Sequence, residues 1–162
     1  MKRIFIFSFL LLIFGVSNAR DIFACDCIIG TSENLQEFQK LVEYAYEHSE
    51  AVFSGKVIEI SKKPHSSIVS VKFKVDKSWK NVSRKETLEL ITGEDDADCG
   101  YKFEVGKKYL VYTHSKKYPL YAQGKTDILE TGICTRTAPA GANKDVAFLN
   151  KIKKPKIKSS PK

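Results

Sequence analysis

The sequence predicts a mainly β fold, a small β-barrel of Greek-key type with flanking helices, on three observations. Five short segments rich in β-branched and aromatic residues follow one another after residue 50. Segments with apolar residues at helical spacing precede and follow them. Gly55 lies inside a strand segment, where it indicates a bulge or sharp bend, as in small closed barrels. A β-sandwich is the alternative architecture.

The two helices are expected at residues 33–48 and near residues 142–154. Thr31 or Ser32 can cap the start of the first helix. We interpret its apolar stripe as a face toward the core. The residues of this stripe are Leu35, Phe38, Leu41, Val42 and Ala45.

The strands are predicted from alternation and from turn signals. Between residues 68 and 80, apolar Val69, Val71 and Phe73 alternate with polar residues, which is typical of a half-buried strand. The other strands are expected at residues 51–63, 86–92, 107–113 and from residue 127. The acidic loop with Asp95, Asp96 and Asp98 lacks the spacing of a calcium-binding loop, which favours a solvated loop.

The N-terminal residues 1–19 have the pattern of a signal peptide. Lys2 and Arg3 precede an apolar run over residues 4–14, and Ala19 ends a small-residue cleavage motif. A retained membrane anchor is the alternative, but a span needs about 20 apolar residues. We therefore expect an exported chain without a transmembrane anchor, secreted or periplasmic, with one domain over residues 20–150. We expect it to be a monomer.

The four cysteines indicate disulfide bonds in an oxidising compartment. Cys25 and Cys27 are too close to bond to each other without strain, and in an extended segment they point to opposite faces. Two crossed pairings with Cys99 and Cys134 remain, and both pin the N-terminal segment to two distant parts of the chain. The spacing does not match a zinc site, so no metal and no cofactor are expected.

Charge and motifs exclude several function classes. The formal net charge is +8, but residues 20–150 are neutral, because 19 basic residues there match 19 acidic ones. The excess lies in a Lys-rich tail over residues 151–162, which we expect to be disordered, and no nucleic-acid partner is expected. No catalytic motif stands out, so we expect no enzyme. Arg136 and Asp98 are interpreted as structural.

The order of motifs resembles a known family. The chain contains "CDC", "AVFSGKV", "VKFKVDKSWK", "DCGYKFEVGKKYLVYT" and "ICTRT" in that order. This resembles the N-terminal domain of the tissue inhibitors of metalloproteinases (TIMP-like) and the wider netrin-like group of secreted OB-fold modules. The resemblance covers residues 25–150. It implies a five-stranded OB-fold barrel with the disulfide pairs Cys25–Cys99 and Cys27–Cys134.

The resemblance also implies a site and a partner. An inhibitor of this family chelates the catalytic zinc of a metalloproteinase through the α-amine and carbonyl oxygen of its first cysteine. Transferred to this chain, Cys25 is the chelating residue, Asp26 enters the specificity pocket and Cys27 completes the inhibitory edge. Cleavage after Ala19 would instead leave Arg20 to Ala24 ahead of Cys25, and its nitrogen would then be an amide. The alternative is a non-inhibitory, protein-binding OB-fold module; acylation of Cys25 is a further alternative.

Overall fold

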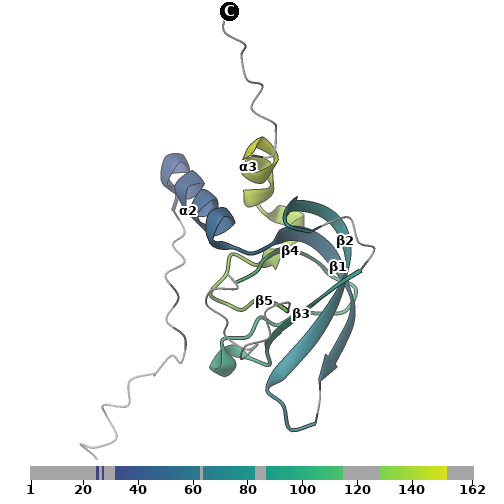
Figure 1. Ribbon diagram of the computed structural model, residues 1–162. Helices are drawn as coiled ribbons and strands as arrows, with labels where there is room; N and C mark the ends of the chain where they lie inside the picture. Colours follow the sequence, from purple (N-terminus) through teal and green to yellow (C-terminus); the bar gives the residue numbers. More distant parts are fainter. Residues whose placement is uncertain are drawn as a thin grey trace, which may run out of the picture.

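The structure is a computed structural model that describes Cys25, Cys27 and residues 32–62, 64–82, 87–114 and 128–152. The expected signal peptide, Asp26 and residues 153–162 of the tail lie outside the described residues. In chain order the elements are α2 (Leu35–His48), β1 (Val52–Lys62), β2 (Ile68–Lys80), β3 (Thr87–Gly93), the 3-10 turn η1 (Asp96–Asp98), β4 (Lys108–Tyr112), β5 (Leu129–Glu130), β6 (Ala138–Pro139), the 3-10 turn η2 (Ala140–Ala142) and α3 (Asp145–Ile152) (Figure 1).

The strands form one mixed sheet in the order β5-β3-β2-β1-β4-β6. Neighbouring strands are antiparallel except for β3 and β5, which run parallel. The prediction of a mainly β fold with flanking helices is confirmed. Within the described residues the sheet has six strands where five were expected, and their order, with β5 and β6 at the two edges, does not close into a barrel. The additional strand, β6, ends at Pro139, which has no N–H and suits an edge strand.

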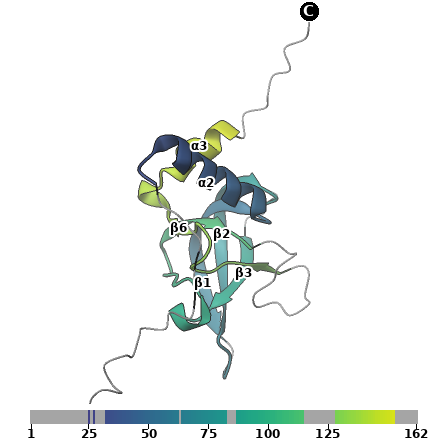
Figure 2. The same ribbon diagram turned by 90° about the vertical axis from the view of Figure 1, so that its left-hand side faces the viewer.

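Two apolar clusters lie on opposite faces of this sheet. Along β1, Val52 belongs to one cluster and Phe53 to the other, because successive side chains of a strand point to opposite faces. The Phe53 cluster includes Phe73, Leu90 and Val111. The Val52 cluster joins the sheet to the helices and includes Val42, Trp79, Tyr112 and Leu149. Figures 1 and 2 both place α2 and α3 at one end of the sheet.

Gly55 lies at a register shift between β1 and β2, as the sequence predicted. A Cβ atom at this position would lie 2.7 Å from the carbonyl oxygen of Lys74. The close approach of the two backbones therefore requires a glycine here. A register shift of this kind bends the strand that contains it, here β1. β1 pairs with β2 along its length and with β4 over its first half.

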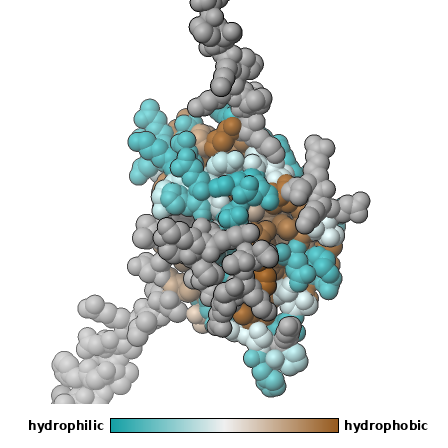
Figure 3. All heavy atoms as spheres, viewed as in Figure 1, coloured by the Kyte–Doolittle hydropathy of each residue, from teal (hydrophilic) through white to brown (hydrophobic). Residues whose placement is uncertain are grey.

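The apolar stripe of α2 covers the core only in part, which corrects the expectation for its first turn. Val42 is fully buried and Phe38 and Ala45 are half-buried against the helix-side cluster. Leu35, the first helical residue, is 68% exposed. The space-filling view shows the hydrophilic surface of α2 beside hydrophobic surface on the side of α3 (Figure 3).

Gly100 is predicted to be the least replaceable glycine among the described ones. A Cβ atom here would lie 2.1 Å from the carbonyl oxygen of Gly93, which is backbone and cannot turn away. We expect Gly100→Ala to lower the free energy of unfolding by about 3 kcal/mol. Urea unfolding followed by the fluorescence of Trp79, the single tryptophan, measures the change. Gly141→Ala is the matched control, because a Cβ atom there meets nothing within 4 Å; equal effects of the two changes would contradict the prediction.

Candidate functional site

The candidate site is the short N-terminal stretch that two disulfide bonds fix to the domain. Cys25 is bonded to Cys99 with a Cα–Cα distance of 5.7 Å, and Cys27 to Cys134 with a Cα–Cα distance of 4.9 Å. This is the pairing that the resemblance implies, and the spacing alone had left a second one open. Both N-terminal cysteines are half-buried. Asp26, the residue between them, lies outside the described residues.

The backbone around Cys99 is held in a tight turn. The carboxylate of Asp95 accepts a hydrogen bond from the Ala97 N–H at 2.9 Å and caps the 3-10 turn η1. Cys99 follows in the left-handed conformation, with φ 56°, and its N–H donates to the Asp96 carbonyl. The Gly100 N–H then donates to the Asp95 carbonyl at 2.8 Å. Asp95 thus has a local structural role, and it lies in an exposed loop, as the sequence predicted.

The turn that carries Cys134 is fixed to the same region. The Ile133 N–H donates to the carbonyl oxygen of Cys99 at 3.0 Å, so the two disulfide-bearing turns are hydrogen-bonded directly to each other. On the other side of the turn, the Thr131 hydroxyl donates to the Tyr112 carbonyl at 2.8 Å and lies 2.9 Å from the Thr137 hydroxyl. The N-terminal stretch therefore rests on a rigid support made of two turns.

The disulfide bonds determine which cysteine chemistry this edge can offer. All four cysteines are in disulfide bonds, so the edge offers no thiolate. Within the described ranges, no group of three or more His, Cys, Asp or Glu residues could hold a metal ion. The half-buried Cys25 and Cys27 are thus each covalently bonded to a turn of the domain.

Arg136, two residues after Cys134, has a structural role, as predicted from the sequence. Its guanidinium group donates two hydrogen bonds to the carboxylate of Asp145, both at 2.8 Å. The Tyr112 hydroxyl donates to the same carboxylate at 3.0 Å. The hydrogen bond to Asp145 raises the pKa of Arg136, and burial raises the pKa of Tyr112. This buried group connects β4, the start of α3 and the chain after Cys134.

His114 connects the end of β4 to β5. Its backbone N–H donates to the Glu130 carbonyl at 2.8 Å. Its Nε2 atom is buried and has no hydrogen-bond partner among the residues that the structure describes. Burial lowers the pKa of this imidazole, and the nearby Glu130 carboxylate opposes that shift in part.

The stability of the fold is therefore predicted to fall on mild acidification. The unfolded chain protonates His114 near the ordinary pKa of 6.5, whereas the folded chain does so only at lower pH. The unfolded state thus binds more protons below pH 6.5, and the His114 contribution is lost as the pH falls from there toward the folded-state pKa. Urea midpoints at about pH 7.5 and about pH 5.5 measure this. A smaller pH dependence in His114→Phe supports the assignment, and an unchanged one contradicts it.

Comparison with known proteins adds no family assignment. No protein-family model matches the chain, and no curated protein matches it. Within the described residues, no helix is long and apolar enough to cross a membrane.

Proposed function

We propose that the chain is an exported TIMP-like inhibitor that binds a zinc metalloproteinase through the edge formed by Cys25, Asp26 and Cys27. The observation that carries this proposal is the pair of disulfide bonds to Cys99 and Cys134. They fix the edge before any partner arrives, so little conformational entropy is lost when it enters a protease cleft. The direct hydrogen bond between the two supporting turns makes the edge more rigid still.

An OB-fold barrel is the architecture proposed for this inhibitor. Three features of the sheet support it. The strands β1, β2 and β3 form an antiparallel meander, β1 also pairs with β4, and β3 pairs with β5 in parallel. The hydrogen bond from the His114 N–H to the Glu130 carbonyl joins the end of β4 to β5, the two strands that must meet for the barrel to close.

The proposed inhibition follows from the donors left at Cys25. Its sulfur is in a disulfide bond, so the donors available to the protease zinc are the α-amine and the carbonyl oxygen. A free amine has a lone pair for zinc, whereas the nitrogen of an amide does not donate well. Chelation by both atoms occupies the position of the zinc-bound water and removes the nucleophile. The mechanism therefore requires a mature chain that begins at Cys25.

A non-inhibitory binding module is the second candidate function, and the N-terminal sequence favours it. Cleavage after Ala19 leaves five residues, Arg20 to Ala24, ahead of Cys25, and these convert its nitrogen into an amide. Asp26 would also place a carboxylate in a protease pocket that is apolar in this family's targets, which is unfavourable unless the charge is paired. In that case the same rigid fold presents other surfaces to its partner.

The intact mass and the N-terminal residue of the exported protein test the two functions. The inhibitor proposal predicts an unacylated chain that begins at Cys25, contains two disulfides and inhibits at least one zinc metalloproteinase of a panel. A chain that begins at Arg20 and inhibits none supports the binding module. An acylated Cys25 would contradict the disulfide to Cys99 and with it the proposed edge.

A further inference from the structure

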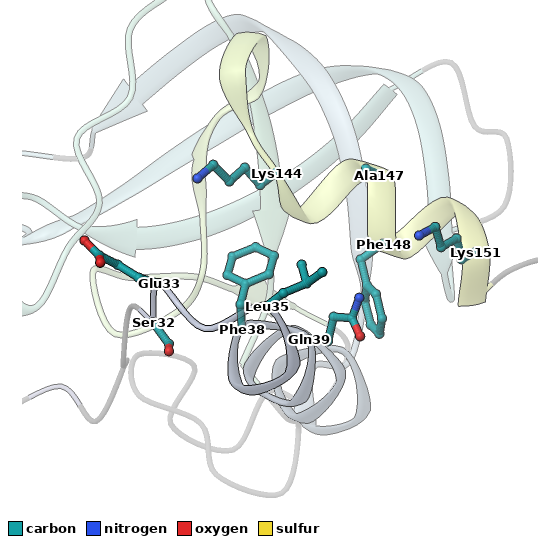
Figure 4. Close-up of a pocket in the computed structure, with 9 residues that line it drawn as sticks. All are labelled: Ser32, Glu33, Leu35, Phe38, Gln39, Lys144, Ala147, Phe148 and Lys151. Carbon is teal, nitrogen blue, oxygen red and sulfur yellow. The ribbon is translucent and has the colours of Figure 1, made fainter.

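An apolar groove runs between the two helices. Its volume is about 640 Å³, and its walls are one face of α2 and one face of α3 (Figure 4). Leu35 and Phe38 line it from α2, and Ala147 and Phe148 line it from α3. Leu35 and Phe38 are three residues apart on one face of α2, and Ala147 and Phe148 are neighbours on α3, so each helix presents apolar side chains to the groove.

The floor of the groove is preformed. Phe38 and Phe148 are half-buried and pack against the cluster that joins the helices to the sheet. The guanidinium group of Arg136 lies 5.4 Å from the centre of the Phe38 ring and packs against that ring. Leu35 is 68% exposed at the groove. A partner that covers Leu35 therefore gains apolar burial without reorganising the floor.

Two lysines give the α3 wall a positive charge. Lys144, immediately before α3, and Lys151, in the last turn of α3, both line the groove and lie toward opposite ends of it (Figure 4). Both are exposed, and neither takes part in the ion pairs found among the described residues. Among the described residues that line the groove, the one acid is Glu33, beside the start of α2 (Figure 4).

We propose that this groove binds an acidic amphipathic helix of a partner protein. The apolar stripe of that helix would pack on Leu35, Phe38 and Phe148. Carboxylates spaced by about two turns would pair with Lys144 and Lys151. An apolar channel with cations along one wall fits this occupant better than a basic or a neutral peptide.

This inference is independent of the inhibitory edge. Figures 1 and 2 place η1, which immediately precedes Cys99, at the end of the sheet away from α2 and α3. The Cys25–Cys99 bond and the groove therefore lie on separate parts of the domain. Each can fail its test without affecting the other.

Fluorescence anisotropy with three labelled helical peptides tests the proposal on the disulfide-bonded chain. The peptides have 14 residues, the length of α2, and share one apolar stripe, with glutamate, glutamine or lysine beside it. We expect the glutamate peptide to bind at least about tenfold more tightly than the glutamine peptide, and the lysine peptide to bind least. An equal or reversed order, or no binding of the glutamate peptide at millimolar protein, would overturn the proposal.

Matched variants locate the binding. Leu35→Gln should weaken the binding of the glutamate peptide about tenfold. Tyr44→Gln, at a 63% exposed position of the same helix, should leave that affinity unchanged. Joint reversal of Lys144 and Lys151 to glutamate should make the lysine peptide the preferred one. The same reversal at Lys56 and Lys74, an exposed cross-strand pair, changes the net charge equally and should leave the order unchanged.

Other occupants of the groove would give different results. Self-association of the wild-type chain that Leu35→Gln abolishes would show that a second copy covers the groove. Binding to vesicles of anionic lipid that depends on Leu35, without binding of the glutamate peptide, would show a membrane surface. Either result would overturn the assignment to an acidic helix.

Discussion

Replacing Cys27 and Cys134 together by alanine is expected to lower the free energy of unfolding by about 4 to 5 kcal/mol. The bond joins residues 107 positions apart, and closing so long a loop removes much conformational entropy from the unfolded chain. A loss of this size is a large share of the stability of an ordinary domain. Urea unfolding followed by Trp79 fluorescence, without reductant, measures it.

The matched control is the Cys25→Ala, Cys99→Ala pair. Its loop is shorter, with a sequence separation of 74, so the expected loss is slightly smaller on the same entropy argument. The two losses should therefore be similar and both large. A change of less than about 1 kcal/mol in either pair would show that the N-terminal stretch is not held as the structure describes.

The second large effect is expected at the buried ion pair. Arg136→Met should lower the free energy of unfolding by about 3 to 5 kcal/mol, because it leaves the Asp145 carboxylate buried without its cation. The side chains of Arg136 and Asp145 are only 12% and 4% exposed. Arg136 also lies over the ring of Phe38, so its loss should loosen α2 as well as α3. Urea unfolding gives the stability, and amide hydrogen exchange in the two helices gives the local effect.

An exposed ion pair provides the control for this prediction. Lys108→Met breaks the contact with Asp76, in which the side chains are 59% and 40% exposed, and water screens such a pair. We expect little change in stability from it. Arg136→Lys keeps the charge but cannot donate two parallel hydrogen bonds to the carboxylate, so its loss of stability should lie between those of the other two changes. Equal losses for Arg136→Met and Lys108→Met would contradict the structural role of the buried pair.

Much of the fold could be predicted because its signals are local. Alternation in "IVSVKFKV" identifies β2, and Gly55 marks the register shift in β1, since only a glycine fits against the Lys74 carbonyl. The strand β6 could not be predicted, because Ala138 and Pro139 show no alternation and form a strand only by pairing with β4. The Cys25–Cys99 and Cys27–Cys134 pairing came from the family resemblance rather than from the spacing.

The features of the sites that were not predicted depend on contacts between distant elements. Arg136 and Asp145 pair through the packing of α3, which no spacing rule indicates. The apolar period of α2 assigns Leu35 to a covered face, but only the tertiary structure shows that α3 and the sheet leave it exposed. The groove between the helices was missed for this reason.

The inhibitory role of the Cys25–Cys27 edge is tested most directly by comparing two mature chains that differ by one residue. One begins at Cys25 and the other at Ala24, and both must contain the two disulfide bonds. The proposed mechanism predicts that only the chain with a free α-amine on Cys25 inhibits a zinc metalloproteinase of the panel. Equal inhibition by both chains, or inhibition by neither, would contradict zinc chelation at this edge.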